Sequence, residues 1–533
     1  MRKHQQKQIS QLLGQIKKTQ LEGQYAACQE ASLFLCDFID DNAGEGTQTA
    51  RMLVEYCELL FRAHNGENVK SLLKKRIVDI ENSVNKELIA TKLEMAFITY
   101  RAAQSDAIES IYFAAKEDPD CNAYWIPVPY YEYEEEEWDG KSKDRKRTRE
   151  LFEGAEYYSE KFECIDYKEY DIKARKPDAA FSFALWDETS YMMEVHPDYL
   201  FKNLQNNAGV SVAVPYYLLD DYASDADKTD EELIAIMKKV HKNSGMHYRK
   251  LAVRPGYVYS DKVIMPTETA NRRYKLSFKG NVKGFGKADE KYVAMGSPKI
   301  EKIVKATRED YPLPQEWLEM IGDKKVILCS HTVGDISGRG MQIIKKMTEM
   351  FEMFAERDDV VLWWRPHPLI ETSLRAKDPM LAENYRQTID AYKRLGIGIF
   401  DDTTEYHRSL AWADAYYGSY GTLPKSFPFI GRPAMLQNVK MSGRKVEGVA
   451  PPKSEDYNFN KEELMSLVGY AHNETDKIRL EDFLNFVLSE DNSPEMVEKR
   501  KEKYLAAYAV NPYDSGKKIY EYIKAEVLRR LES

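Results

Sequence analysis

The 533-residue sequence lacks the motifs that mark several common classes of enzyme. It contains no Walker A sequence, no GxSxG, no HExxH and no group of residues with convincing metal-ligand spacing. Its cysteines are few, widely scattered and never arranged as CxxC; they are Cys28, Cys36, Cys57, Cys121, Cys164 and Cys329. This usage is typical of a reduced cytosolic chain and excludes a disulfide framework or a zinc site. We therefore expect neither a metal nor a cofactor.

Long apolar runs and an excess of positive charge are also missing. No segment approaches the roughly 20 apolar residues of a membrane-spanning helix, and the opening stretch, MRKHQQKQISQLLGQIKK, has no apolar signal-peptide core. We expect a cytoplasmic protein whose contact with a membrane, if any, is peripheral and at the inner face. The net charge of −10 argues against general affinity for nucleic acid, which needs a basic footprint, but allows a local basic site for an anionic ligand.

One stretch of the chain is strongly charged. Residues 131–150, YEYEEEEWDGKSKDRKRTRE, join an acidic block to a basic one and predict an exposed loop between strands. The basic part, residues 141–149, could contact anionic lipid or polymer. The alternative is a solvated loop whose charges partly neutralise each other.

The rest of the chain shows two hydrophobic patterns, each typical of one kind of structure. Residues 1–90 carry apolar side chains at three-and-four spacing and predict a helical extension. Residues 91–300 and residues 301–533 each alternate short apolar runs with helical segments, which predicts parallel βαβ units. The predicted fold is α/β: two Rossmann-like domains that face each other across a cleft, the second of them ending in helices.

The most informative residues follow the apolar run VVLWW at residues 360–364. Ligands of such folds lie outside the carboxyl ends of the strands, so Arg365 and His367 should face the cleft. Pro366 and Pro368 fix the backbone around His367 and hold both side chains on a stiff loop. A guanidinium suits phosphate, and an imidazole offers a donor or a proton near neutral pH. The alternative is that Arg365 pairs with a nearby Asp and His367 caps a loop.

The other strand ends of this half carry hydroxyls and a glycine. The residues concerned are His331, Thr332, Thr403, Ser419, Gly421 and Thr422. A helix that starts after such a loop offers free amides and a positive dipole end, which together form an anion site. We therefore expect a phosphate-bearing ligand, although Thr422 could be only a helix cap. Thr403 or Thr404 is expected to cap the helix that follows it, with Glu405 in its first turn.

The first half of the α/β region offers less chemistry. Beyond the strand-like run AAFSFAL and the one after it lie Asp187, Glu188, His196, Tyr216, Tyr217, Asp220 and Asp221. His196 precedes Pro197 and is either a base or a satisfied loop histidine.

Three blocks of this sequence resemble a known family. They are AIESIYFAAKEDPDCNAYWIPVPYYEY, then EVHPDYLFKNL with VAVPYYLLDD, then VVLWWRPHPLIE through GIGIFDDTTEYHRSLAWADAYYGSYGTL. Together they resemble the CDP-glycerol glycerophosphotransferases, the bacterial enzymes of teichoic-acid-type polymer synthesis in the cell envelope. The resemblance runs from about residue 93 onward and leaves the helical extension outside it. It implies a GT-B fold with a first, acceptor-side domain and a second, nucleotide-binding domain.

The resemblance also implies roles for individual residues. The family's RPHP motif falls on Arg365 and His367, which makes His367 a catalytic candidate and Arg365 a substrate-binding one. Its D-Y-S-S segment falls on residues 419–422, where Ser419 replaces the Asp and Gly421 replaces the first Ser. Its Trp-His-Gly motif falls on residues 215–217, where no histidine stands. His196 is the remaining candidate for a base.

These expectations combine into one hypothesis and two rivals. The diphosphate of a CDP-linked donor lies near residues 419–422, a polyol-phosphate or glycan hydroxyl attacks the distal phosphorus, and CMP leaves. The same cleft would serve a GT-B glycosyltransferase that uses a nucleotide sugar. The changes at Ser419 and Gly421 also allow a non-catalytic nucleotide-binding relative.

Overall fold

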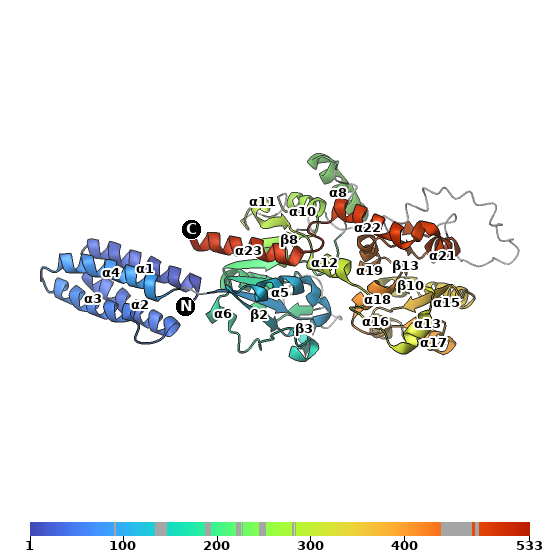
Figure 1. Cartoon of the computed structure of the whole chain (residues 1–533), viewed down its shortest axis with the longest axis horizontal. Helices are drawn as coiled ribbons and strands as arrows, with labels where there is room; N and C mark the ends of the chain where they lie inside the picture. The colour runs from blue at the N-terminus through green and yellow to red at the C-terminus, as the bar shows by residue number, and fades with distance from the viewer. Residues whose placement is uncertain are drawn as a thin grey trace.

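The computed structural model describes residues 1–89, 92–133, 147–186, 193–219, 225, 227–244, 252–279, 282, 284–438, 472–474 and 479–532. Figure 1 shows an elongated molecule in which a helical extension, a first α/β domain and a second α/β domain follow one another. Most of the charged stretch at residues 131–150, together with Asp187, Glu188, Asp220 and Asp221, lies outside the described residues.

The helical extension is an antiparallel layer of four helices: α1 (Lys3–Leu21), α2 (Tyr25–Ala43), α3 (Gln48–His64) and α4 (Lys70–Glu87). Apolar residues at helical spacing, Leu35, Leu53 and Leu73 among them, are fully buried between the helices. The layer meets the first domain at the end away from the second domain (Figure 1). At that junction the Lys7 ammonium donates to the Arg530 carbonyl at 2.9 Å.

The first α/β domain is built on a six-stranded parallel sheet of order β2-β1-β5-β7-β8-β9. The strands are β1 (Leu93–Thr99), β2 (Cys121–Pro127), β5 (Ala179–Ser182), β7 (Val210–Ala213), β8 (Lys262–Met265) and β9 (Tyr292–Ala294). Every residue of β1 is buried, as expected of a central strand covered on both faces. A small antiparallel sheet, β4-β3-β6, adds β3 (Tyr130–Tyr133), β4 (Arg147–Leu151) and β6 (Met193–Val195).

The helices of the first domain lie mainly between these strands. They are η1 (Ala102–Ala107), α5 (Glu109–Glu117), η2 (Ala155–Tyr157), α6 (Ile172–Arg175), η4 (Pro197–Tyr199), α7 (Phe201–Asn207), α8 (Asp230–Ser244), α9 (Pro255–Tyr259), α10 (Glu268–Lys279) and α11 (Ala288–Lys291). Chain connections run outward in opposite directions from β1 and from β5, so the topological switch point of this sheet lies between those two strands.

The second α/β domain repeats the plan with the sheet order β12-β11-β10-β13-β14-β15. Its strands are β10 (Lys325–Cys329), β11 (Val360–Trp364), β12 (Gly398–Phe400), β13 (Ala415–Gly418), β14 (Ala434–Leu436) and β15 (His472–Asn473). All pairings within it are parallel, and its switch point lies between β10 and β13. The prediction of two Rossmann-like domains after a helical extension is confirmed.

The helices of the second half, in chain order, are α12 (Pro298–Lys305), α13 (Gln315–Ile321), α14 (Val333–Arg339), α15 (Met341–Ala355), α16 (Ile370–Lys377), α17 (Pro379–Leu395), α18 (Tyr406–Trp412), α19 (Thr422–Ser426), η7 (Phe427–Ile430), α21 (Leu480–Leu488), η9 (Glu490–Asn492), α22 (Pro494–Tyr508) and α23 (Ser515–Glu532). None of the described helices is long and apolar enough to cross a bilayer.

The last helix departs from the predicted domain boundary. The sequence reading placed everything from residue 301 onward in the second domain, but α23 returns to the first domain and packs beside α5 (Figure 1). Its apolar residues Ile519, Ile523 and Val527 are buried in the first domain's core. The chain therefore crosses between the domains twice, once before α12 and once before α23.

The two crossings touch each other at Gly296, which has a φ of +94°. A Cβ added there would lie 2.2 Å from the Val510 carbonyl oxygen, so this close approach requires glycine. The Asn511 side-chain amide adds a 3.1 Å hydrogen bond to the Met295 carbonyl. This close contact between the two crossings fixes the place at which the two domains meet.

Candidate functional site

The switch point of the second sheet brings two predicted loops together. The Ser419 amide, just after β13, donates to the Ser330 carbonyl, just after β10, at 2.9 Å. Gly418 makes the approach possible, because a Cβ there would lie 2.4 Å from the same carbonyl oxygen. A Cβ built on Gly421 would lie 3.6 Å from the Thr332 methyl carbon. Loops 330–332 and 419–422 therefore lie against each other at the carboxyl ends of β10 and β13, the place where folds of this kind have their ligand crevice.

The Ser419 hydroxyl is the unusual group in this crevice. Ser419 is only 4% exposed, and its Oγ has no hydrogen-bond partner among the described residues. Its carbonyl, by contrast, accepts the Tyr416 hydroxyl at 2.7 Å, which fixes the backbone. A buried hydroxyl without a partner has a free-energy cost that a bound acceptor would remove.

His331 supports the crevice from inside the protein. It is fully buried, and its Nε2 donates to the Gln437 side-chain oxygen at 2.8 Å. Burial lowers the pKa of His331, against the hydrogen bond to Gln437, so its ring is neutral at physiological pH. Thr332 accepts the Asp335 amide at 3.2 Å and so caps α14. The predicted contact of His331 with substrate would require it to leave this buried position.

Arg365 lies where the sequence predicted, at the end of β11, but its guanidinium already has partners. It donates to the Asp401 carboxylate at 2.6 Å and to the Thr403 carbonyl at 2.5 Å, and Arg365 is 8% exposed. Asp401 is fully buried and also accepts the Trp363 indole at 3.1 Å. These contacts match the alternative in which Arg365 pairs with a nearby Asp. Through them Arg365 holds the loop after β11 against the loop after β12. Its predicted contact with a phosphate stays a prediction.

Thr403 belongs to the same network and does not cap a helix. Its amide and hydroxyl both donate to Asp401 Oδ1, at 3.0 and 2.7 Å. Because the hydroxyl is engaged there, the cap of α18 is Glu405, whose carboxylate accepts the His407 amide at 2.9 Å. The prediction of Thr403 or Thr404 as N-cap is wrong, because the Asp401 turn delays the start of the helix.

His367 is exposed at the tip of its loop, between Pro366 and Pro368. Its Nδ1 accepts the Leu369 amide at 3.2 Å, so the neutral ring carries its proton on Nε2. Burial of part of the ring and the positive charge of Arg101 lower the pKa of His367. Arg101 follows β1 of the first domain, so His367 lies within electrostatic reach of that domain. As placed, His367 can donate a hydrogen bond through Nε2.

Thr422 is exposed and begins α19, a helix of only five residues. Such a short helix carries little dipole, so the anion site predicted at its start would depend on hydroxyl and amide donors.

His196 is not at this crevice. It follows β6 of the small first-domain sheet and lies among the rings of Tyr131, Tyr167 and Tyr199 at centroid distances of 6.4, 5.5 and 5.8 Å. Its Nδ1 accepts the Asp198 amide at 3.3 Å, which caps the turn η4. These contacts match the alternative of a satisfied loop histidine.

Sequence reasoning missed a charged cluster between the domains. Asp106 in η1 is 3% exposed and accepts the Lys299 ammonium at 2.5 Å and the Tyr406 hydroxyl at 2.6 Å. His407 Nε2 lies 3.2 Å from the same carboxylate oxygen. Burial alone would raise the pKa of Asp106, but Lys299 and His407 outweigh it and hold that pKa well below its usual value. No sequence signal could have found partners 193 and 300 residues away.

It also missed Arg101 and Arg254, two arginines of the first domain that stack on aromatic rings. A signal existed for Arg101, because it follows the strand-like run LEMAFITY and the rule of carboxyl strand ends applies to it as well.

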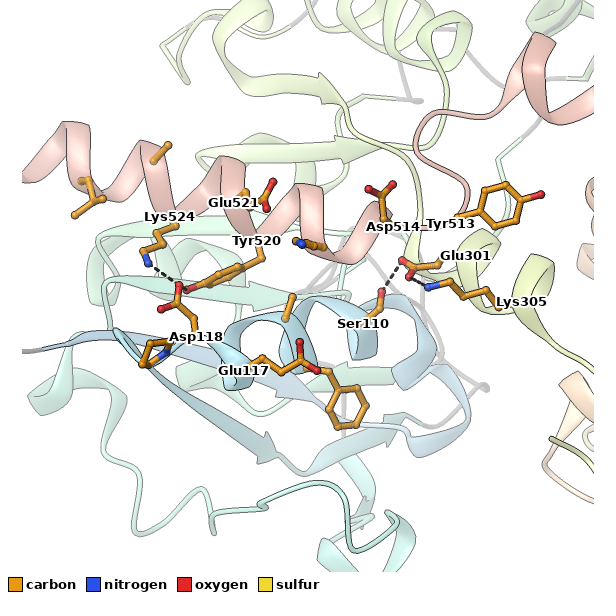
Figure 2. A pocket seen from close by; sticks show the side chains of 16 residues that line it. Ser110, Glu117, Asp118, Glu301, Lys305, Tyr513, Asp514, Tyr520, Glu521 and Lys524 are labelled. Carbon is orange, nitrogen blue, oxygen red and sulfur yellow. Dashed lines mark hydrogen bonds and ion pairs between the residues drawn. The ribbon is translucent and has the colours of Figure 1, made fainter.

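A pocket of about 830 Å³ lies away from these strand ends, between α5, α12 and α23 (Figure 2). The buried carboxylate of Glu301 lies at one end of it and accepts the Ser110 hydroxyl at 3.0 Å and the Gly516 amide at 2.8 Å. Tyr520 and Lys524 of α23 reach Asp118 at 2.6 and 2.5 Å (Figure 2). The polar groups at both ends of the pocket thus pair with one another, and the pocket marks the junction of the two domain crossings.

No family model and no curated protein matches the chain. Among solved structures, it is similar to MnaA of S. aureus with UDP, at a TM-score of 0.44 and 12% identity over 82% of this chain and 97% of that one. A variant of the wall teichoic acid polymerase TagF gives 0.43 and 13%, over 92% and 100%. UDP-GlcNAc 2-epimerase from Neisseria meningitidis, bound to UDP-GlcNAc, gives 0.41 and 11%, over 82% and 100%. Sequence identities of 11–13% and TM-scores of 0.41–0.44 leave the activity to be inferred from the chain's own residues.

Proposed function

We propose that this protein is a transferase that binds a CDP-linked donor in the crevice between β10 and β13. It would transfer glycerol phosphate, or a related polyol phosphate, to an acceptor hydroxyl in the synthesis of a cell-surface polymer. The observation that carries the proposal is the buried hydroxyl of Ser419 at the switch point of the second sheet, which has no hydrogen-bond partner in the described part of the chain. The resemblance of the RPHP and ADAYYG segments supplies the donor class.

The donor's diphosphate would be held by neutral donors more than by a free cation. The Ser419 hydroxyl would donate to a phosphate oxygen, and the Thr332 and Thr422 hydroxyls lie on the two loops that border it. His367, at the end of the neighbouring strand β11, would donate a hydrogen bond to the diphosphate through its Nε2–H group. Arg365 would act as a positioning residue, because its pair with Asp401 holds the loops after β11 and β12 together.

The transfer itself balances without a cofactor. The acceptor oxygen forms a bond to the distal phosphorus, the bond from that phosphorus to the bridging oxygen breaks, and CMP leaves with the electron pair. The acceptor's proton passes to solvent or to a base. Such reactions are catalysed mainly by positioning and by stabilising the developing charge. The proposal assigns no residue as that base, and the contacts of His196 are those of a histidine that caps the turn η4.

Ligand binding and turnover test the proposal separately. We would titrate CDP-glycerol, CDP-ribitol, UDP-glucose and UDP-GlcNAc and follow the melting temperature, since a ligand that binds only the folded state raises it. Preference for the CDP-polyols, with CMP release on adding a polyol-phosphate acceptor, is the expected result. Preference for UDP-sugars would favour the glycosyltransferase, and tight CDP binding without CMP release would favour a non-catalytic relative.

The Ser419→Val variant isolates the crevice. Valine replaces the hydroxyl by a methyl group and adds a second methyl group, so it removes the donor and also occupies the space beside it. We expect weaker CDP binding by about tenfold, the usual cost of losing a hydrogen bond to a charged group. Ser337→Val, on the exposed face of α14, is the matched control and should bind CDP as the wild type does. Unchanged CDP binding by Ser419→Val would remove the crevice from the proposal.

A further inference from the structure

A cavity of about 370 Å³ lies where the helical extension meets the first domain. One wall is α1, a second wall is the end of α23, and the floor is formed by the segments that lead into β5 and β7. Figure 1 shows the start of α1 beside the end of α23. The cavity thus lies at the amino edge of the first sheet, whereas the loops that we propose to bind the donor follow strands of the second sheet.

Two lysines that line this cavity form no ion pair with a carboxylate in the described part of the chain. Lys7 of α1 donates to the Arg530 carbonyl at 2.9 Å, which leaves other protons of its ammonium available. Lys176 is exposed, and its ammonium makes no hydrogen bond or ion pair with the residues that the structure describes. Asp178, an acidic residue of the lining, is 3% exposed, and its carboxylate accepts the Glu94 amide at 2.8 Å. The cavity therefore has two cations to offer to an external anion.

Arg530 also lines the cavity, but carboxylates already neutralise it. Its guanidinium donates to the Glu526 carboxylate at 3.0 Å and to the Asp261 carboxylate at 3.2 Å. It also donates to the Gly209 carbonyl at 2.9 Å, which holds the end of α23 against the segment before β7. Arg530 therefore shapes the cavity, and the charge available to a ligand comes from Lys7 and Lys176.

The backbone of Lys176 is in the left-handed region, with a φ of +45°. A side chain other than glycine has a free-energy cost in this conformation. The Lys176 amide donates to the Ile172 carbonyl at 3.0 Å, and the Lys176 carbonyl accepts the Arg2 guanidinium at 3.3 Å, so both backbone groups are fixed. Strained positions of this kind are common where a protein binds a ligand. A lysine at a position that favours glycine indicates a role for its side chain.

The rest of the lining combines amides with apolar groups. The amide side chains and two of the apolar ones are Gln8, Gln11, Asn206, Asn207, Pro177 and Val527. Amides donate to and accept from hydroxyls, ammonium groups bind phosphate, and apolar groups pack against carbon. None of the described residues that line the cavity is aromatic, so a nucleobase would have no ring on which to stack. The volume lies at the lower end of the range of about 300–1,000 Å³ that is typical of small-molecule sites.

We propose that this cavity binds a small sugar phosphate and that the bound ligand fastens the helical extension to the first domain. Lys7 binds the phosphate from the extension and Lys176 binds it from the first domain, while amides of both parts hold the hydroxyls. The site does not depend on the proposed function, because no group of the donor loops takes part in it. The rival is a cavity that holds only water.

The experiment is a calorimetric titration of the full chain with glucose 6-phosphate, glucosamine 6-phosphate and ribose 5-phosphate. Inorganic phosphate and glucose are the control ligands. We expect at least one sugar phosphate to bind more tightly than phosphate does, and glucose not to bind. Added salt should weaken the binding of the sugar phosphate, because the contact with the two lysines is ionic.

Variants of the two lysines test their contribution. Lys176→Asn, which suits the left-handed backbone, and Lys7→Gln should each weaken sugar phosphate binding by about tenfold. Lys176→Arg, which keeps the charge, should bind more tightly than Lys176→Asn. Lys173→Gln is the matched control, because Lys173 is an exposed lysine of α6 outside the lining, and it should bind as the wild type does. Circular dichroism of each variant shows that it is folded.

Hydrogen exchange followed by mass spectrometry locates the ligand. Saturation with the sugar phosphate should slow exchange in residues 7–11 and 206–210 and leave loops 330–332 and 419–422 unchanged. Protection of those loops instead would place the ligand at the proposed donor site and overturn the inference.

The other outcomes also overturn it. If none of the three sugar phosphates binds, the cavity is not such a site, and equal affinity of all variants places the anion elsewhere. Binding of inorganic phosphate as tight as that of the sugar phosphates would mean that the amides and the apolar floor do not contribute. A separate titration with CDP tests the proposed function: CDP binding without sugar phosphate binding would overturn this inference alone, and the reverse result would overturn the donor proposal alone.

Discussion

The Tyr406 hydroxyl of the second domain donates a 2.6 Å hydrogen bond to the Asp106 carboxylate of the first. The Lys299 ammonium reaches the same oxygen at 2.5 Å, and all these groups are buried or half-buried. The segments that follow β1 in the first domain and β12 in the second domain therefore meet at a buried charged cluster.

Replacing Asp106 by Asn should destabilise the protein strongly. The change leaves the buried Lys299 ammonium without its counter-charge, which typically costs about 3–5 kcal/mol. Tyr406→Phe removes one hydrogen bond and should cost about 1–2 kcal/mol. Urea unfolding followed by tryptophan fluorescence measures both. Glu383→Gln, which breaks an exposed pair with Arg386, is the control and should stay within about 0.5 kcal/mol of wild type.

The Asp106 cluster also predicts an acid dependence. Because the folded state lowers the pKa of Asp106, its contribution is present above the unfolded value and is lost as pH falls toward the folded value. Asp106→Asn should therefore lose less stability than wild type on going from pH 5 to pH 3. Parallel pH profiles for the two proteins would contradict the assignment.

Two substitutions distinguish a supporting role for Arg365 from direct contact with the ligand. Arg365→Gln removes the cation that neutralises the buried Asp401 carboxylate. Asp401→Asn removes the anion that neutralises the Arg365 guanidinium. If Arg365 mainly supports the loops, both variants lose about 3 kcal/mol of stability and both bind CDP more weakly. If Arg365 contacts phosphate directly, Asp401→Asn frees it and CDP binds more tightly. The measurements are urea unfolding and CDP titration.

Arg101→Gln should raise the pKa of His367. The substitution removes a positive charge that disfavours imidazolium, while the burial that contributes most to the lowered value stays, so the pKa should remain below its ordinary value. Proton NMR titration of the His367 ring measures it, with His367→Gln to assign the signal. An unchanged value would mean that the two domains are farther apart in solution than in the structure.

Lys291 gives a prediction at alkaline pH. It is 5% exposed, its ammonium donates to the Val258 carbonyl at 3.1 Å, and burial lowers its pKa to about 8. Between that value and the ordinary one near 10.4, the unfolded chain binds more protons, so stability rises with pH. Wild type should gain about 2 kcal/mol over Lys291→Met from pH 8 to about pH 10. Lys287→Met, at an exposed position, should show no such divergence in urea unfolding.

The sequence patterns that predicted the fold were local ones. Apolar runs such as residues 360–364 became buried parallel strands, and helical spacing over residues 1–90 became four helices. The domain of α23 could not be read in the same way, because Ile519 and Ile523 show that one face is buried but not which sheet buries it. The rule that ligands lie at the carboxyl ends of parallel strands likewise predicted that loops 330–332 and 419–422 lie close together.

The same rule could not say which polar groups remain available. Arg365 and Ser419 both follow buried strands, yet Asp401 engages the guanidinium while nothing in the described ranges engages the Ser419 hydroxyl. That difference depends on partners set by the packing of distant segments. Asp106 was missed for the same reason, since its partners come from α12 and α18.

The return of α23 to the first domain has a consequence for biosynthesis. During translation the six strands of the first sheet emerge long before Ile519, Ile523 and Val527, the side chains that complete its hydrophobic layer. The core of the first domain therefore stays incomplete until the second domain has been synthesised and α23 has followed it. A ribosome-bound chain arrested after α22 should expose an apolar surface beside α5, and a chaperone would recognise that surface.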